Sequence, residues 1–154
     1  MKTSFASDPI PESVHQAIGK AEKLADQSVW GRVYEVMSGV LKELDALGVE
    51  SGYCFWLAAV ASDSTGDLVE AVRHIARARA VDLGFSRALN SEKIILGKVF
   101  TLMDMAGVDD LEVQALVEAV RASFPPTHPG LQYLENKLSE AITAAQTTNN
   151  RAQA

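Results

Sequence analysis

The segment from Gly66 to Gly84, "GDLVEAVRHIARARAVDLG", is the part of the chain that decides the fold. Its apolar residues recur every three or four positions, as they do along one face of an α-helix. They are Leu68, Val72, Ile75, Ala76 and Ala78. Glycine and aspartate at the start favour a turn and a helix cap, and Gly84 is a typical helix stop. We therefore predict an amphipathic helix over residues 67–83.

The same helical period continues along most of the chain, and no segment alternates convincingly as a strand would. The predicted helices span residues 12–28, 31–47, 52–62, 67–83, 86–105, 108–124 and 129–146. Residues 52–62 are apolar almost all round, so this helix should be the most buried. We predict one all-α domain over residues 11–146, with a flexible N-terminal segment at 1–10 and a disordered tail at 147–154.

Composition narrows the class of protein. Apolar residues make up 47% of the 154, enough for the core of one domain. The net charge of -6 argues against general nucleic-acid binding, which uses clustered Lys and Arg. The longest uncharged run, about 51–62, is shorter than the roughly 20 residues of a membrane-spanning helix. The N-terminal residues lack the apolar run of a signal peptide, and Cys54 is the single cysteine, so we expect a cytoplasmic protein.

An internal repeat groups the predicted helices into pairs. "GRVYEVM" begins at Gly31 and "GDLVEAV" begins at Gly66, and both place Glu and apolar residues at matching positions. A third glycine followed by an acidic turn, "GVDDLEV", begins at Gly107. Gly31 and Gly66 are 35 residues apart, and a repeat of about this length is typical of proteins built from stacked helical hairpins.

The second hairpin resembles a tetratricopeptide repeat. Residues 52–84 give the good match, and the flanking hairpins match more weakly. The matching positions are Gly66, Asp67, Leu68, Glu70, Ala71, Val72, Ala78, Val81 and Asp82, whereas Leu83 stands where the family has proline. The resemblance implies a right-handed array of about three antiparallel hairpins with a C-terminal capping helix. The alternative is an irregular helical bundle.

In this family the first helix of each hairpin lines a concave groove. The resemblance therefore implies the groove residues Tyr53, Trp56, Val60, Arg87, Asn90, Ile94 and Lys98, with Gln16 and Lys23 as counterparts in the first hairpin. Such a surface suits a peptide with apolar anchors and some acidic character. The alternatives are plain core burial for Trp56 and a solvated surface position for Asn90.

Cations outnumber acids between Arg73 and Lys98. Arg73, Arg77 and Arg79 form a candidate basic patch for an acidic partner segment. The alternative is a set of solvated helix faces.

Catalytic and metal-binding patterns are weak. His15, His74 and His128 lie on different segments, and none has a second ligand at metal-binding spacing. Cys54 lies in the most apolar helix, where a small core residue is expected. We therefore expect no enzymatic activity, no cofactor and no metal.

These features favour a protein-binding module that holds a partner peptide or partner protein in its groove. By analogy of size and architecture, it would be a small adaptor or a secretion-type chaperone. The alternatives are a structural or oligomerising subunit of a larger assembly and a helical small-molecule sensor. If the chain is a subunit of an assembly, it could also form a homo-oligomer. We do not expect nucleic acid or membranes as partners.

Overall fold

The computed structural model describes residues 10–153 of the chain, and this part contains helices and connecting turns but no strand. The predicted all-α fold is confirmed. The helices are α1 (Glu12–Asp26), α2 (Trp30–Ala46), α3 (Gly52–Ser64), α4 (Leu68–Val81), α5 (Ser86–Ala106), α6 (Leu111–Ser123) and α7 (Pro129–Gln153). Of the expected N-terminal flexible segment, residues 1–9 lie outside the described residues, and Ile10 is half-buried against the core.

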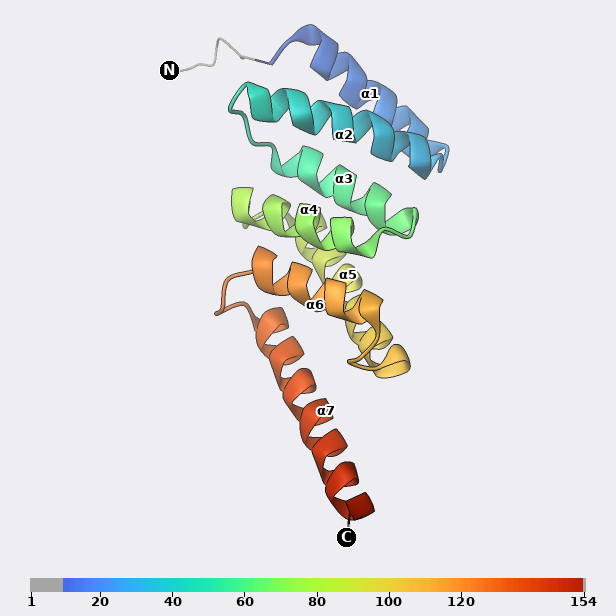
Figure 1. Cartoon of the computed structure of the whole chain (residues 1–154). Helices are drawn as coiled ribbons and strands as arrows, with labels where there is room; N and C mark the ends of the chain where they lie inside the picture. Colours follow the sequence, from blue (N-terminus) through green and yellow to red (C-terminus); the bar gives the residue numbers. More distant parts are fainter. Residues whose placement is uncertain (1–9, 154) are drawn as a thin grey trace.

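The helices lie one after another along a column, and consecutive helices run in alternating directions (Figure 1). The extensive contacts among the described helices join neighbours in the sequence or next neighbours, such as α3 with α5 and α4 with α6. The pair that packs most extensively is α3 with α4. Small residues explain this packing, because Ala71 and Ala78 of α4 are fully buried and a Cβ on Gly52 would lie 3.3 Å from Cβ of Asp82.

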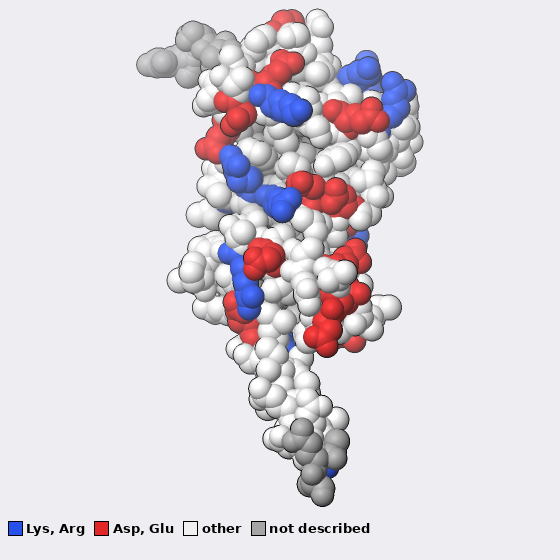
Figure 2. Space-filling view, in the orientation of Figure 1, with Lys and Arg blue, Asp and Glu red and all other residues white. Residues whose placement is uncertain are grey.

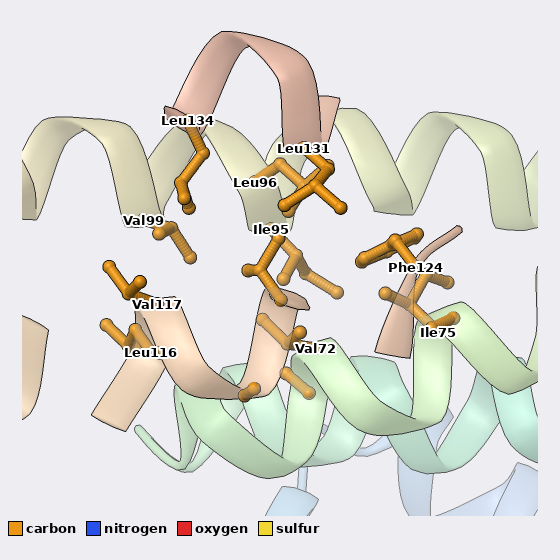
Figure 3. Packing of buried hydrophobic residues seen from close by; sticks show 14 of the residues in the cluster. Val72, Ile75, Ile95, Leu96, Val99, Leu116, Val117, Phe124, Leu131 and Leu134 are labelled. Carbon is orange, nitrogen blue, oxygen red and sulfur yellow. The ribbon is translucent and has the colours of Figure 1, made fainter. Parts of the chain in front are cut away.

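The apolar side chains form two cores that meet at α3. The first core lies between α1, α2 and α3 and includes Val14, Met37 and Leu57. The second core gathers residues of α4, α5, α6 and the start of α7 (Figure 3). Trp56 of α3 packs against both cores, so this residue joins the two halves of the column.

Two helix boundaries differ from the prediction because aspartate side chains set them. The helix α6 begins at Leu111 instead of 108, since Oδ2 of Asp110 accepts a hydrogen bond from the backbone N–H of Val113 at 3.0 Å. The helix α4 ends at Val81, where Asp82 turns to an extended conformation. Oδ1 of Asp82 accepts the N–H of Gly84 at 3.0 Å, so Asp82 ends this helix, ahead of the glycine that was expected to do so.

The last helix is longer than predicted. Residues 147–153, expected to be a disordered tail, continue α7 to Gln153. The sequence after Gln146 contains no Gly or Pro, and the hydroxyl of Thr148 donates to the carbonyl of Ala144 at 3.0 Å, as a helix allows. The first turns of α7 bury Leu131 and Leu134, whereas residues 142–151 are exposed and the helix projects from the column (Figure 1).

A buried carboxylate connects α4, α5 and the start of α7. The side chain of Glu92 on α5 is 7% exposed, and its Oε1 lies 3.4 Å from Nε of Arg79 and 3.2 Å from Nε2 of His128. Nδ1 of His128 also accepts the backbone N–H of Gly130 at 2.9 Å, so this histidine caps the first turn of α7. None of the helices within residues 10–153 is both long enough and apolar enough to cross a membrane.

Candidate functional site

The aromatic hollow is a surface cavity of about 510 Å³ that residues from α1, α3 and α5 and the start of α2 enclose. Its lining consists of Glu22, Ala25, Asp26, Trp30, Tyr53, Trp56, Leu57, Val60 and Arg87. The residues that α1 and α3 contribute recur at intervals of three and four, so each helix presents one face to the hollow. Three of the nine are aromatic, which makes the hollow a candidate for binding rather than a gap between polar surfaces.

Four of the seven groove residues expected from the sequence meet in this hollow. Tyr53, Trp56 and Val60 come from α3, and Arg87 comes from the first turn of α5. The three α3 side chains are half-buried, and Arg87 is exposed. Packing of α3 against α5 brings together residues that are separated by about a whole repeat in the sequence.

Tyr53 is held in place by a contact with α1. Its phenol O–H donates a hydrogen bond to Oε2 of Glu22 at 2.5 Å. Burial, followed by the hydrogen bond to this carboxylate and its negative charge, raises the pKa of Tyr53 to about 12. At neutral pH the phenol is therefore a neutral donor with a fixed direction.

Trp56 presents one part of its ring to the core and another to the hollow. Its Nε1–H donates to Oγ of Ser91 on α5 at 3.0 Å. Its ring centroid lies 5.6 Å from that of Tyr53 and 5.7 Å from that of Phe85. The guanidinium carbon of Arg87 lies 5.6 Å from the Trp56 ring centroid, a cation–π arrangement. Trp56 is therefore partly buried against the core and also lines the hollow, whereas its role in binding a partner stays a prediction.

The other three expected groove residues lie outside the aromatic hollow, farther along α5. Asn90 and Ile94 are exposed, and the Ile94 side chain leaves half of its surface in solvent. The Nζ atom of Lys98 is 2.7 Å from Oδ1 of Asp63, so this lysine connects α5 to the end of α3. Asn90, Ile94 and Lys98 follow Arg87 at helical spacing and continue the same face of α5 away from the hollow.

The expected basic patch is not a cluster of free positive charge. Arg73 pairs with Glu70 at 3.2 Å, Arg77 pairs with Glu50 at 3.0 Å, and Arg79 turns toward the buried Glu92. Between Arg73 and Lys98 the sequence shows more cations than acids. Glu50 lies outside this interval, and only the folded chain brings it beside Arg77. Lys and Arg alternate with Asp and Glu over the face shown in Figure 2.

A second hollow of about 510 Å³ lies between α2 and α4, with Phe55 of α3 also in its lining. Arg73, His74 and Arg77 line it, and the Arg77 guanidinium carbon lies 4.8 Å from the Phe55 ring centroid. Burial lowers the pKa of His74, although the nearby Glu70 acts in the opposite direction. His74 is thus a half-buried groove residue and not a freely solvated one.

Sequence reasoning missed five of the nine residues that line the aromatic hollow, including Ala25 and Leu57. Glu22, Asp26 and Trp30 line it, whereas Gln16 and Lys23 of the same region do not. A signal was present in the sequence: Glu22 and Asp26 are four residues apart near the C-terminal end of a helix, where the helix dipole disfavours acids. Acids at such a position often serve a purpose other than helix stability.

No group of three or more His, Cys, Asp or Glu side chains within the described residues is arranged to hold a metal ion. Cys54 is buried and unpaired, as its apolar helix predicted. Comparisons with protein-family models, with curated proteins and with solved structures found no significant match to this chain.

Proposed function

We propose that this protein is a non-enzymatic protein-binding module that holds an extended or helical segment of a partner protein against α1, α3 and α5. In this proposal the pairs α1/α2, α3/α4 and α5/α6 are tetratricopeptide-like hairpins of a right-handed array, and α7 covers the open end. A cytoplasmic adaptor or secretion-type chaperone would act in this way, by shielding an apolar segment until the partner is needed.

One observation carries the proposal: Tyr53, Trp56, Val60 and Arg87 line a single hollow although two different hairpins supply them. The hollow combines large rigid rings with an arginine, and these residue types contribute most binding energy at interfaces. Arg87 is exposed and takes part in no ion pair within the described residues. Its guanidinium can therefore pair with an acidic group of the partner. Ile94 offers an apolar contact farther along α5.

A peptide selection tests this role although the partner is unidentified. A displayed library of random peptides is selected against the wild-type protein, and the enriched peptides are then titrated against Val60→Arg, which fills the hollow with a long charged side chain. We expect the affinity to fall by about tenfold or more in Val60→Arg. It should stay unchanged in Lys42→Glu, which reverses a charge in the lining of the second hollow.

Circular dichroism of both variants is the control, and it should show that they remain folded. A selection that enriches no saturably binding peptide contradicts the proposal. So do peptides that bind Val60→Arg as tightly as the wild type.

Self-association is the second candidate function, and the exposed half of α7 favours it. Leu131, Leu134, Leu138, Ala141, Ala145 and Thr148 recur at alternating intervals of three and four, the period of a coiled-coil seam. The first two are buried within the chain, whereas the later part of this seam is uncovered and Ile142 beside it is 51% exposed. An isolated helix shorter than about 12–15 residues is marginal in water, so a second copy packed along this seam would stabilise it.

Sedimentation equilibrium over a wide concentration range tests self-association. We expect a mass that rises from the 16.6 kDa of one chain toward twice that value. Ile142→Asp should return the mass to that of one chain, while Ile94→Asp, an equally exposed apolar position on α5, should not. A constant single-chain mass for the wild type rejects this second function.

A further inference from the structure

The aromatic hollow contains negative charge that no ion pair within residues 10–153 neutralises. Glu22 and Asp26 line it, and both side chains are exposed. Within residues 10–153, neither carboxylate takes part in an ion pair, and the contact of Glu22 is with the neutral phenol of Tyr53. Two like charges four residues apart on one helix repel each other, and the C-terminal end of α1 adds the negative end of its dipole.

The same hollow is walled by aromatic rings. Trp30, Tyr53 and Trp56 line it, and the rings of Tyr53 and Trp56 meet at an interplanar angle of 43°. Faces of aromatic rings attract cations, and enclosure by several rings is the usual means of recognising ammonium groups. Carboxylates at the edge of such a site add a direct charge attraction to the attraction by the rings.

The negative and the positive charges of the hollow come from different helices. Arg87 enters from α5 and lies against Trp56, whereas Glu22 and Asp26 enter from α1. The helix α3 lies between α1 and α5 in the column (Figure 1). The α1 side of the hollow is therefore acidic, and the α5 side already has its own cation.

We propose that the α1 side of the aromatic hollow receives a cationic side chain of the partner segment, the ammonium of a lysine or the guanidinium of an arginine. The cation lies against Trp30 and Tyr53 and is neutralised by Glu22 and Asp26. This inference rests on the proposed function and specifies the partner: its segment carries a basic residue beside the apolar anchors, and any acidic group lies toward Arg87. A hollow of about 510 Å³ has ample room for such a side chain.

A titration with three small probes of equal length tests the inference on the full chain. The probes are n-butylammonium, n-butanol and butyrate, three four-carbon molecules that carry a positive charge, no charge and a negative charge. The readout is the indole N–H resonance of each tryptophan, assigned with Trp30→Phe. We expect butylammonium to shift the Trp30 resonance saturably and about tenfold more tightly than butanol, with no saturable shift for butyrate.

Charge-removing variants locate the effect. Asp26→Asn and Glu22→Gln should each weaken butylammonium binding several-fold and leave the weak butanol response in place. Glu70→Gln, which removes a carboxylate from the second hollow, should leave butylammonium binding unchanged. Any one of three results overturns the inference. Butylammonium causes no saturable shift, it binds no better than butanol, or its binding is unchanged by Asp26→Asn.

The two proposals fail in distinguishable ways. The selected peptides could need the open hollow and yet contain no basic residue, while butylammonium fails to bind. This result would support the binding module and reject the cationic anchor. Butylammonium binding with no selected peptide would support the cation site and reject the module that holds a partner segment.

Discussion

The phenol of Tyr53 on α3 donates a 2.5 Å hydrogen bond to the carboxylate of Glu22 on α1, and this contact joins two helices across the aromatic hollow. The contact fixes the ring that forms one wall of the hollow. It also helps to raise the pKa of the phenol, which a titration can measure. Both properties follow from placing a half-buried tyrosine beside a carboxylate that has no cation as partner.

The ionisation of Tyr53 yields the first prediction. Its folded-state pKa of about 12 lies above the ordinary value of 10.0, so folding favours the neutral phenol. The stabilisation is complete below pH 10 and is lost as the pH rises through about 12. We expect ultraviolet titration to show a late-ionising tyrosine that disappears in Tyr53→Phe, and Glu22→Gln to lower its pKa only part of the way, since burial remains. A wild-type chain in which Tyr53 ionises near pH 10 contradicts the described contact.

The buried carboxylate of Glu92 yields the second prediction. Glu92→Ala leaves Arg79 and His128 without the group that lies between them. Breaking a buried ion pair on one side costs about 3 kcal/mol, and urea denaturation should show a loss of this size. Glu140→Ala, at an exposed position of α7, should change the free energy of unfolding by less than about 0.5 kcal/mol. Equal effects of the two substitutions would mean that Glu92 does not connect these helices.

Two glycines in the same region yield a third prediction with opposite signs. Gly97 lies inside α5, and a Cβ built there meets nothing within 4 Å, so Gly97→Ala should raise the free energy of unfolding by about 0.5–1 kcal/mol. Gly107 ends α5 with φ of +87°, a conformation that disfavours side chains. Gly107→Ala should lower the free energy of unfolding by about 1–2 kcal/mol. Urea denaturation of the two variants checks both signs, and a stabilising Gly107→Ala would contradict this helix ending.

The single thiol yields a fourth prediction. Burial raises the pKa of Cys54, and the side chain is nearly inaccessible. The thiol should therefore react with a disulfide reagent only when α3 separates from its neighbours, at a rate that rises with urea and follows global unfolding. The hydrogen-exchange rate of the Trp56 backbone amide, on the same helix, provides a comparison with the rate of thiol labelling. Fast labelling of Cys54 under native conditions would show that α3 is not the packed centre of the column.

Local periodicity predicted the helices, whereas the resemblance to a tetratricopeptide repeat implied the α3 part of the hollow. Tyr53, Trp56 and Val60 lie at helical spacing, so they share one face of α3 once that face is known. The register of α1 against α3 depends instead on how closely the helices pack, and so Glu22 and Asp26 were missed. Helix packing also pairs Arg77 with Glu50, which the spacing within α4 cannot indicate.

The end of α7 illustrates a different limit. Polar composition predicted a disordered tail after Gln146, yet the helix continues to Gln153. Composition reports the lack of a core-forming face, whereas the helix itself needs only continuing hydrogen bonds and the absence of glycine and proline. The end of α7 is thus helical, polar and exposed over residues 142–151, a combination that composition alone does not predict.

The central claim is that a partner segment occupies the aromatic hollow, and the indole N–H resonances of Trp30 and Trp56 test it most directly. A peptide from the library selection is titrated into the isotope-labelled protein, and the two resonances are followed to saturation. The proposal predicts that both resonances shift with the same saturation curve as the peptide's binding isotherm, and that Val60→Arg abolishes the shifts. A peptide that binds saturably while both indole resonances stay in place would contradict it.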